Sequence, residues 1–220
     1  MKRVFAFCLS VFALFLFCPS AFADNESAEP LKIAGGTYEV GDDIPAGKYA
    51  VSVVSGFGYL TVFDSYEDYL KAEGDRDEAN ISYFLDADGT HGTQNVGLLH
   101  LNEGMFVSNQ NASTIFTPVT KPVAEAGTDQ MFVLYPGVYV VGEDFPAGKY
   151  SAEVVSGFGY FSVFQSYEKY LEVEGYAYDA LETHFLDGDG THGATEIGSF
   201  RLTDGMYVTN QGATLNVMPK

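Results

Sequence analysis

Two short acidic loops contain the residues best suited to chemistry in this sequence. The first is the heptapeptide DADGTHG at 86–92, and the second is DGDGTHG at 187–193. In each loop two carboxylates stand two residues apart before a glycine, and Ca²⁺ binds to oxygen ligands in loops of this kind. The candidate metal ligands are therefore Asp86, Asp88, Asp187 and Asp189.

The same loops also fit a purely structural interpretation. An EF-hand needs a further ligand two residues before the first aspartate, and Phe84 and Phe185 occupy those positions. Aspartate and glycine are in any case residues that suit a tight turn. We therefore expect no bound cofactor, and a weak Ca²⁺ site is the alternative that the sequence leaves open.

A histidine follows the aspartates in each loop, at His91 and His192, which would supply an Asp-His pair for general-base catalysis. A serine nucleophile would have to come from the SGFG segments, at Ser55 or Ser156. Neither serine has the G-x-S-x-G setting that exposes a nucleophile on a sharp turn. The sequence thus predicts that the protein is not an enzyme, and a hydrolase that uses these loops is a remote alternative.

Aromatic residues form the other candidate surface. The chain has 15 Tyr, 18 Phe and no Trp. Tyrosine in particular suits recognition, because it gives a large contact area at low entropy cost. Six aromatic residues recur at equivalent positions on one turn and one strand face: Phe57, Tyr59, Phe63, Phe158, Tyr160 and Phe164. These are candidate ligand-binding residues, and the open alternative is that a helix packs over them in the core.

An internal repeat determines the expected domain organisation. The segment TYEVGDDIPAGKYAVSVVSGFGYLTVF at 37–63 returns as VYVVGEDFPAGKYSAEVVSGFGYFSVF at 138–164, so the offset from 37 to 138 is 101 residues. A copy of about 88 residues is large enough to close a small core of its own. We therefore expect two homologous domains with a leader and a linker, bounded as follows: leader 24–30, domain 31–118, linker 119–131 and domain 132–219.

Short alternating strands and turns dominate each copy. Pro45 with Gly47, and Pro146 with Gly148, predict a turn at each PAG sequence that joins two strands as a hairpin, with the glycine at positive φ. A second turn is expected at residues 55–58, where SGFG separates two apolar runs.

One helix is expected in each copy, and in the first copy it spans residues 65–73. Ser65 can cap its start. Tyr66, Tyr69 and Leu70 fall at i, i+3 and i+4, so this stripe is expected to pack on the sheet. Many short strands with Gly/Pro turns and one short helix predict an all-β chain of two tandem β-sandwich domains, jelly-roll-like in type.

The pattern V-G-x-D-[I/F]-P-A-G-K-Y, followed by V-x-S-G-x-G-Y-x-x-V-F, occurs in both copies. It resembles a small β-rich repeat domain of exported and surface-attached bacterial proteins, and the resemblance covers nearly all of both copies. That family has no assigned catalytic activity, so the resemblance implies bacterial export and a β-sandwich fold without naming a function. This chain departs from the shorter members between Phe63 and Gly97, where it inserts the helix and the aspartate loop.

The sequence also predicts where the protein works. Residues 1–23 combine a basic start, an apolar run and an A-x-A exit, as a secretory signal peptide does. Both cysteines, Cys8 and Cys18, lie inside that segment, so the mature chain has none. The chain carries 30 Asp+Glu against 11 Lys+Arg, a formal net charge of −19 that disfavours nucleic acid as a partner. The expected location is periplasmic or extracellular, including the cell surface.

The combined expectation is an exported, non-enzymatic binding or surface-interaction protein. Two linked copies of one module raise avidity for a repetitive partner, such as a cell-wall polymer or a surface protein. No apolar run after the signal peptide is long enough to span a bilayer, so no stable membrane insertion is expected. The second interpretation is a Ca²⁺-stabilised structural or adhesion module. The sequence predicts no particular ligand and no oligomeric state.

Overall fold

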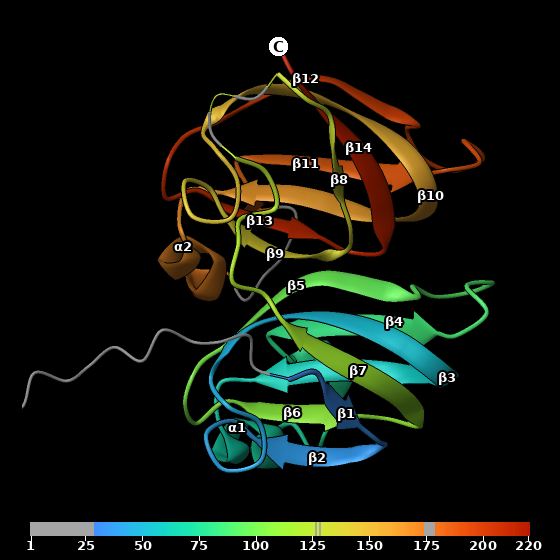
Figure 1. Cartoon of the computed structure of the whole chain (residues 1–220), viewed down its shortest axis with the longest axis vertical. Helices are drawn as coiled ribbons and strands as arrows, with labels where there is room; N and C mark the ends of the chain where they lie inside the picture. The colour runs from blue at the N-terminus through green and yellow to red at the C-terminus, as the bar shows by residue number, and fades with distance from the viewer. Residues whose placement is uncertain (1–28, 126, 128, 174–178) are drawn as a thin grey trace, which may run out of the picture.

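The structure is a computed structural model that describes residues 29–125, 127, 129–173 and 179–220 (Figure 1). The predicted signal peptide, 1–23, lies outside the described residues, as does most of the predicted leader. The described part is mostly β-strand with two short α-helices, which confirms the all-β class. None of its helices has the length and apolar character needed to cross a membrane.

The strands and helices follow the same order in the two halves of the chain. The first half contains, in sequence order, β1 (Leu31–Ile33), β2 (Gly36–Glu39), β3 (Gly47–Phe63), α1 (Tyr66–Lys71), the 3₁₀-helix η1 (Arg76–Glu78), β4 (Ile81–Asp86), β5 (Asn95–Leu101), β6 (Phe106–Asn109) and β7 (Ala112–Pro118). The second half contains β8 (Phe132–Leu134), β9 (Gly137–Val140), β10 (Gly148–Phe164), α2 (Tyr167–Glu172), β11 (Glu182–Asp187), β12 (Glu196–Leu202), β13 (Tyr207–Asn210) and β14 (Ala213–Pro219).

One long strand organises each half. The first part of β3 pairs with β5 and β7, and its second part pairs with β4 and β6, all antiparallel. Strand β1 extends the first set beyond β7, and β2 extends the second set beyond β6. Strand β10 pairs in the same way with β12 and β14 and then with β11 and β13. Each half therefore has two groups of strands that share a single 17-residue strand.

The expected turn at residues 55–58 is wrong, because this segment lies inside β3. The register against β7 shifts between Val53 and Ser55, so the segment is an irregularity within one continuous strand. Gly56 and Gly58 have φ angles of 79° and 158°, in a region that L-residues rarely adopt. A Cβ on Gly58 would also overlap the carbonyl oxygen of Gln110.

The expected PAG hairpin is also wrong. Strand β2 pairs with β6 and not with β3, and neither Gly47 nor Gly148 has a positive φ. Each glycine instead begins a long strand just after a proline, and that proline anchors a tyrosine. The hydroxyl of Tyr49 donates to the Pro45 carbonyl at 2.7 Å, and the hydroxyl of Tyr150 donates to the Pro146 carbonyl at 2.6 Å.

The tight turns lie a few residues earlier. The glycines at positive φ are Gly41 (109°) and Gly142 (92°). Two residues after each of these glycines comes an aspartate, and its carboxylate accepts the backbone amide of the residue four positions before it. Asp43 bonds the Glu39 amide at 2.9 Å, and Asp144 bonds the Val140 amide at 2.7 Å. A short-range bond from a backbone amide to an aspartate carboxylate therefore shapes both turns.

The helices form where the sequence predicts them, but they are not buried equally. Ser65 caps α1 by accepting the Asp68 amide at 3.2 Å. Tyr69 packs on Phe63 with ring centroids 5.4 Å apart. Tyr66 and Leu70, however, are 52% and 54% exposed, so the expected burial of the whole stripe is wrong in the first half.

In the second half the equivalent helix does bury an aromatic residue, because it lies against the first half. Tyr170 of α2 is only 5% exposed, and its hydroxyl donates to the carbonyl of Asn80. The apolar cluster of the first half also includes Val138, Phe164 and Tyr207 from the second half. The two halves therefore share a continuous apolar contact.

The close approach at Gly58 and at its counterpart Gly159 predicts a specific mutational effect. Gly58→Ala and Gly159→Ala should each destabilise the protein by roughly 1–3 kcal/mol or more, because a strained backbone and an overlap with a carbonyl coincide. Gly198→Ala is the matched control, since no heavy atom lies within 4 Å of a Cβ there. Urea unfolding midpoints measure the difference, and equal midpoints for all three variants would contradict this assignment.

Candidate functional site

The first aspartate loop is held by its own carboxylates. Asp86 accepts the amides of Asp88 at 3.3 Å and His91 at 2.9 Å, using one oxygen for each. Asp88 accepts the amide of Thr90 at 2.9 Å. Hydrogen bonding by the side chain of Thr90, and then by its amide, lowers the pKa of Asp88 below its ordinary value. The carboxylate oxygens of this loop thus accept hydrogen bonds from the amides of the loop itself.

The second loop repeats the arrangement. Asp187 accepts the amides of Asp189 at 3.3 Å and His192 at 2.9 Å, and Asp189 accepts the Thr191 amide at 2.8 Å. The first aspartate of each loop is buried. Among the described residues no group of three or more His, Cys, Asp or Glu side chains is placed to hold a metal ion. The geometry accounts for these aspartates as loop-forming residues.

The two loop histidines extend into solvent. The side chains of His91 and His192 are 79% and 80% exposed, with Nδ1 4.0 Å and 3.9 Å from the buried aspartate of each loop. Ser55 and Ser156 lie on the long strands, where they pair with Ser113 of β7 and Thr214 of β14. These strand positions lack the strand-to-helix turn that presents a nucleophilic serine.

The six candidate aromatics do not form one surface. Phe63 and Phe164 are buried beneath the helices, in contact with Tyr69 and Tyr170, so they do not belong to a binding face. The physical reason is that residues 60–63 are covered on both sides, by the core on one and by α1 on the other.

Tyr59 and Tyr160 occupy an intermediate position. The Tyr59 ring lies 5.0 Å from Phe84, with the guanidinium of Arg76 stacked over it at 4.2 Å. The Tyr160 ring lies 5.1 Å from Phe185. Both tyrosines are half-buried and support the aromatic ring on the neighbouring strand.

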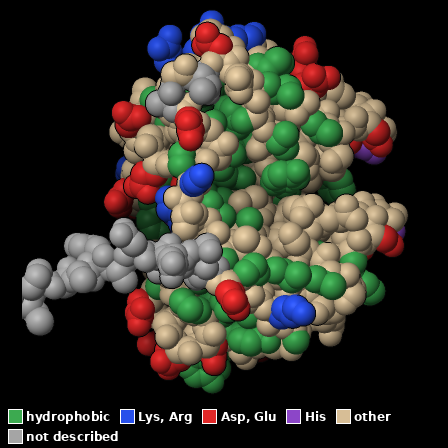
Figure 2. All heavy atoms as spheres, viewed as in Figure 1, with side chains coloured by type: hydrophobic (Ala, Val, Ile, Leu, Met, Phe, Trp, Pro, Cys, Tyr) green, Lys and Arg blue, Asp and Glu red, His purple; other side chains and the backbone are tan. Residues whose placement is uncertain are grey.

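Phe57 and Phe158 are the candidate aromatics that remain exposed, at 67% and 60%. Each lies directly opposite the buried aspartate of its loop, because Phe57 pairs with Asp86 and Phe158 pairs with Asp187. We call Phe57 with residues 86–92 the first rim and Phe158 with residues 187–193 the second rim. In Figure 1 the loops that follow β4 and β11, which contain residues 86–92 and 187–193, extend from the same side of the molecule, and Figure 2 shows histidine beside acidic side chains on that side in both halves.

A further polar site, which the sequence analysis did not find, joins the two halves. The Gly97 amide donates to the Pro136 carbonyl at 2.6 Å, and Leu98 of β5 pairs in parallel with Gly137 of β9. The backbones approach closely because both strands carry glycine here. A Cβ on Gly97 would overlap Tyr139, and a Cβ on Gly137 would lie 2.9 Å from backbone atoms of Leu98. We call this contact the joint.

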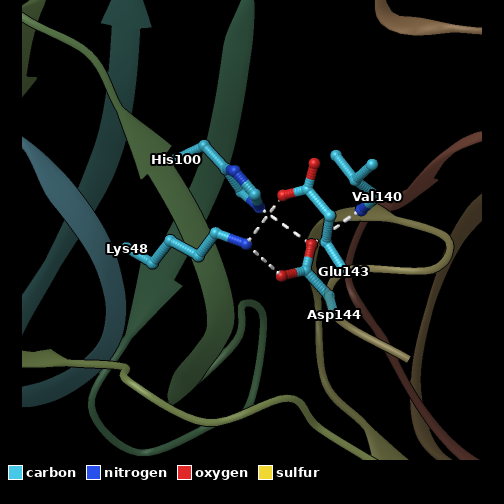
Figure 3. A network of polar contacts seen from close by, with 5 residues as sticks. All are labelled: Lys48, His100, Val140, Glu143 and Asp144. Carbon is cyan, nitrogen blue, oxygen red and sulfur yellow. Dashed lines mark hydrogen bonds and ion pairs between the residues drawn. The ribbon is translucent and has the colours of Figure 1, made fainter. Parts of the chain in front are cut away.

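A buried carboxylate closes one side of the joint (Figure 3). Asp144 receives Nζ of Lys48 at 2.6 Å on one oxygen, and Nε2 of His100 lies 3.0 Å from the other. Glu143 adds a second contact to Lys48 at 3.2 Å from a largely exposed position. Lys48 and His100 belong to the first half and the carboxylates to the second, so the network ties the halves together.

The charges of this network are stabilised against the cost of burial. Burial alone would raise the pKa of Asp144, but hydrogen bonds from His100, Lys48 and the Val140 amide bring that pKa below its ordinary value. Burial would likewise lower the pKa of Lys48, and the bonds to Asp144 and Glu143 raise it above its ordinary value. Both partners are therefore held in their charged forms.

A small cavity of about 180 Å³ lies beside this network, between the halves. Its walls include Tyr167, Tyr170 and Tyr207 from the second half, with His100 and Met105 from the first. The larger hollow on the surface is polar and acidic and involves α1 and η1. The joint thus combines an aromatic wall with a buried ion pair.

The comparisons with known proteins supply no relative for this site. No family model matches the chain, and no curated protein is similar to it. The chemistry of the rims and of the joint is therefore argued from their geometry.

The ion pair of the joint predicts a mutational effect with an internal control. Asp144→Asn should destabilise the protein by about 2–4 kcal/mol, because it leaves Lys48 and His100 without a buried anionic partner. Asp43→Asn should cost less, because Asp43 makes the same bond to its own turn but no contact with the other half. Urea unfolding of both variants gives the comparison, and equal losses would contradict an ion pair across the joint.

The same pair predicts how the effect depends on pH. The pKa of Asp144 is lowered in the folded state, so its stabilisation is present above the ordinary aspartate pKa of about 3.9 and is lost as the pH falls through the lower folded value. The stability difference between wild type and Asp144→Asn should therefore be constant near neutrality and shrink below about pH 4. If the stability difference between wild type and Asp144→Asn stayed the same at lower pH, that result would contradict a stabilising role for the charged Asp144.

Proposed function

We propose that this protein is an exported, non-enzymatic binding protein built from two tandem homologous β-sandwich domains, residues 31–118 and 132–219. The sequence repeat and the identical strand pairing of β3 and β10 support this division. The signal-peptide pattern and the absence of cysteine after residue 18 support export to an oxidising compartment.

The two rims carry the proposal. Each presents one exposed phenylalanine beside a loop whose backbone is fixed by two aspartates. A rigid loop next to an exposed ring can bind a sugar face or a protein surface with little loss of conformational entropy. Because the two loops lie on the same side of the molecule, one extended partner can contact both rims at once, and the linked contacts raise avidity.

The partner class follows from charge and repetition. A formal net charge of −19 disfavours strongly anionic polymers and favours a neutral or cationic surface. A cell-wall polymer with neutral sugar units, or a protein repeated on the cell surface, would match two equivalent rims. A non-enzymatic role agrees with the loop carboxylates, which are engaged by backbone amides, and with the solvent-exposed loop histidines.

The test is retention on isolated cell wall and on immobilised surface proteins. Phe57→Ala with Phe158→Ala should abolish retention, and either single variant should weaken it by more than half through the loss of avidity. Met131→Ala with Met218→Ala is the matched control, because both methionines are exposed apolar residues outside the rims. Retention that the double rim variant leaves unchanged, or turnover of an ester or glycoside substrate, would contradict the proposal.

A further inference from the structure

The joint inside the chain has an unused counterpart at each outer end of the molecule. The second half contributes β9, Asp144 and α2 to the joint, and the equivalent elements of the first half are β2, Asp43 and α1. The first half contributes β5 and Lys48 to the joint, and the equivalent elements of the second half are β12 and Lys149. In Figure 1 the two halves lie one above the other in similar orientations, so β2 lies at one end and β12 at the other.

The strands at the two outer ends are more exposed than the equivalent strands at the joint. Strand β9 is almost wholly buried at the joint, whereas β2 is exposed at three of its four positions. Strand β5 is buried or half-buried throughout, whereas Gly198 and Ser199 of β12 are exposed. No heavy atom lies within 4 Å of a Cβ built on Gly198, so the monomer has open space for a side chain at this position.

Both ends also expose apolar side chains at positions that the joint covers. On α1, Tyr66 is 52% exposed, whereas its counterpart Tyr167 on α2 is half-buried against the first half. At the opposite end Leu181 is 62% exposed, whereas its counterpart Asn80 receives the hydroxyl of Tyr170 across the joint. The two surfaces thus have apolar area that no described segment of the chain covers.

The charges of the two ends are complementary, as they are in the joint. The β12 end carries three exposed cations, Lys149, Arg201 and Lys220, and Nζ of Lys220 bonds the Gly198 carbonyl at 2.6 Å. Figure 2 shows Lys and Arg side chains gathered at that end. The β2 end carries three exposed acids, Glu39, Asp42 and Asp43. Asp42 and Asp43 correspond to Glu143 and Asp144, the two carboxylates that contact Lys48 in the joint.

We propose that copies of this chain associate head to tail, with the β2 and α1 end of one copy seated on the β12 end of the next. Lys149 and Arg201 would then meet Asp43 of the neighbouring copy as Lys48 and His100 meet Asp144 within the chain. Because the two halves are related mainly by a shift along the long axis, repetition of this contact extends a filament and does not close a ring.

The outer contact is more polar than the joint and therefore weaker. Leu98 is replaced by Ser199, and Val140 is replaced by Glu39, so apolar contact is lost and charge is gained. The joint also forms within one chain at high effective concentration, which the outer contact lacks. Association between copies should accordingly depend on protein concentration and weaken as salt screens the charges.

Sedimentation of residues 24–220 over a wide concentration range tests the proposal. At about 0.05 M salt the average mass should rise with concentration beyond that of a dimer, and at about 0.5 M salt it should fall toward the monomer. A monomer mass at every concentration in low salt would overturn the proposal.

Charge reversal identifies the surface. Lys149→Glu with Arg201→Glu should abolish association, as should Glu39→Lys with Asp42→Lys on the other end. Mixing these two double variants should restore association, because the two added lysines beside Asp43 again meet an end of opposite net charge. The matched control is Lys32→Glu with Lys121→Glu, which makes the same change in net charge as the reversal of Lys149 and Arg201, at exposed positions outside β2, α1 and β12. Association that survives the reversal of either end would overturn the proposal.

An uncharged block separates this surface from a general electrostatic effect. Gly198→Trp should leave the unfolding midpoint unchanged, because the site is open in the monomer, and should prevent association. Growth of the mass with concentration in this variant would overturn the proposal. These outcomes do not depend on the rims, so they are independent of the binding function proposed above.

Discussion

The relation between the two halves depends on one buried carboxylate and on the close backbone approach beside it. Asp144 accepts bonds from Lys48 and His100 of the other half and from the Val140 amide of its own turn. It therefore couples the shape of a local turn to the contact between halves. The surrounding apolar contact supplies most of the favourable burial, whereas the ion pair fixes which atoms meet, since an unpaired buried charge would be costly.

Much of the fold follows from local sequence signals. The all-β class and the helix capped by Ser65 could be predicted, because each depends on residues close in the chain. The path of β3 could not. The SGFG segment has the composition of a turn, but Gly56 and Gly58 serve a bend within a continuous strand, against a carbonyl that is distant in sequence. The partner of β2 is likewise β6, far along the chain, and not the strand that follows it.

The candidate sites show the same division. The aspartates of the two loops could be found from their spacing, but only the fold shows that their oxygens bind the backbone of the loop. The exposure of Phe57 and the burial of Phe63 also depend on where α1 lies. The joint has a different signal in the sequence. Leu98 and Val140 correspond to Ser199 and Glu39 in the other half of the chain. The apolar member of each pair lies at the joint, where Leu98 is buried and Val140 half-buried, and the polar member lies at an outer end.

Hydrogen exchange at two equivalent amides tests the joint most directly. The Gly97 amide donates to the Pro136 carbonyl across the joint, whereas Gly198, its counterpart in the second half, lies at an exposed end of the molecule. In dilute, monomeric protein the account predicts that the Gly97 amide exchanges far more slowly than the Gly198 amide, because it opens only when the halves separate. Equal and rapid exchange at both glycines would contradict a fixed contact between the halves.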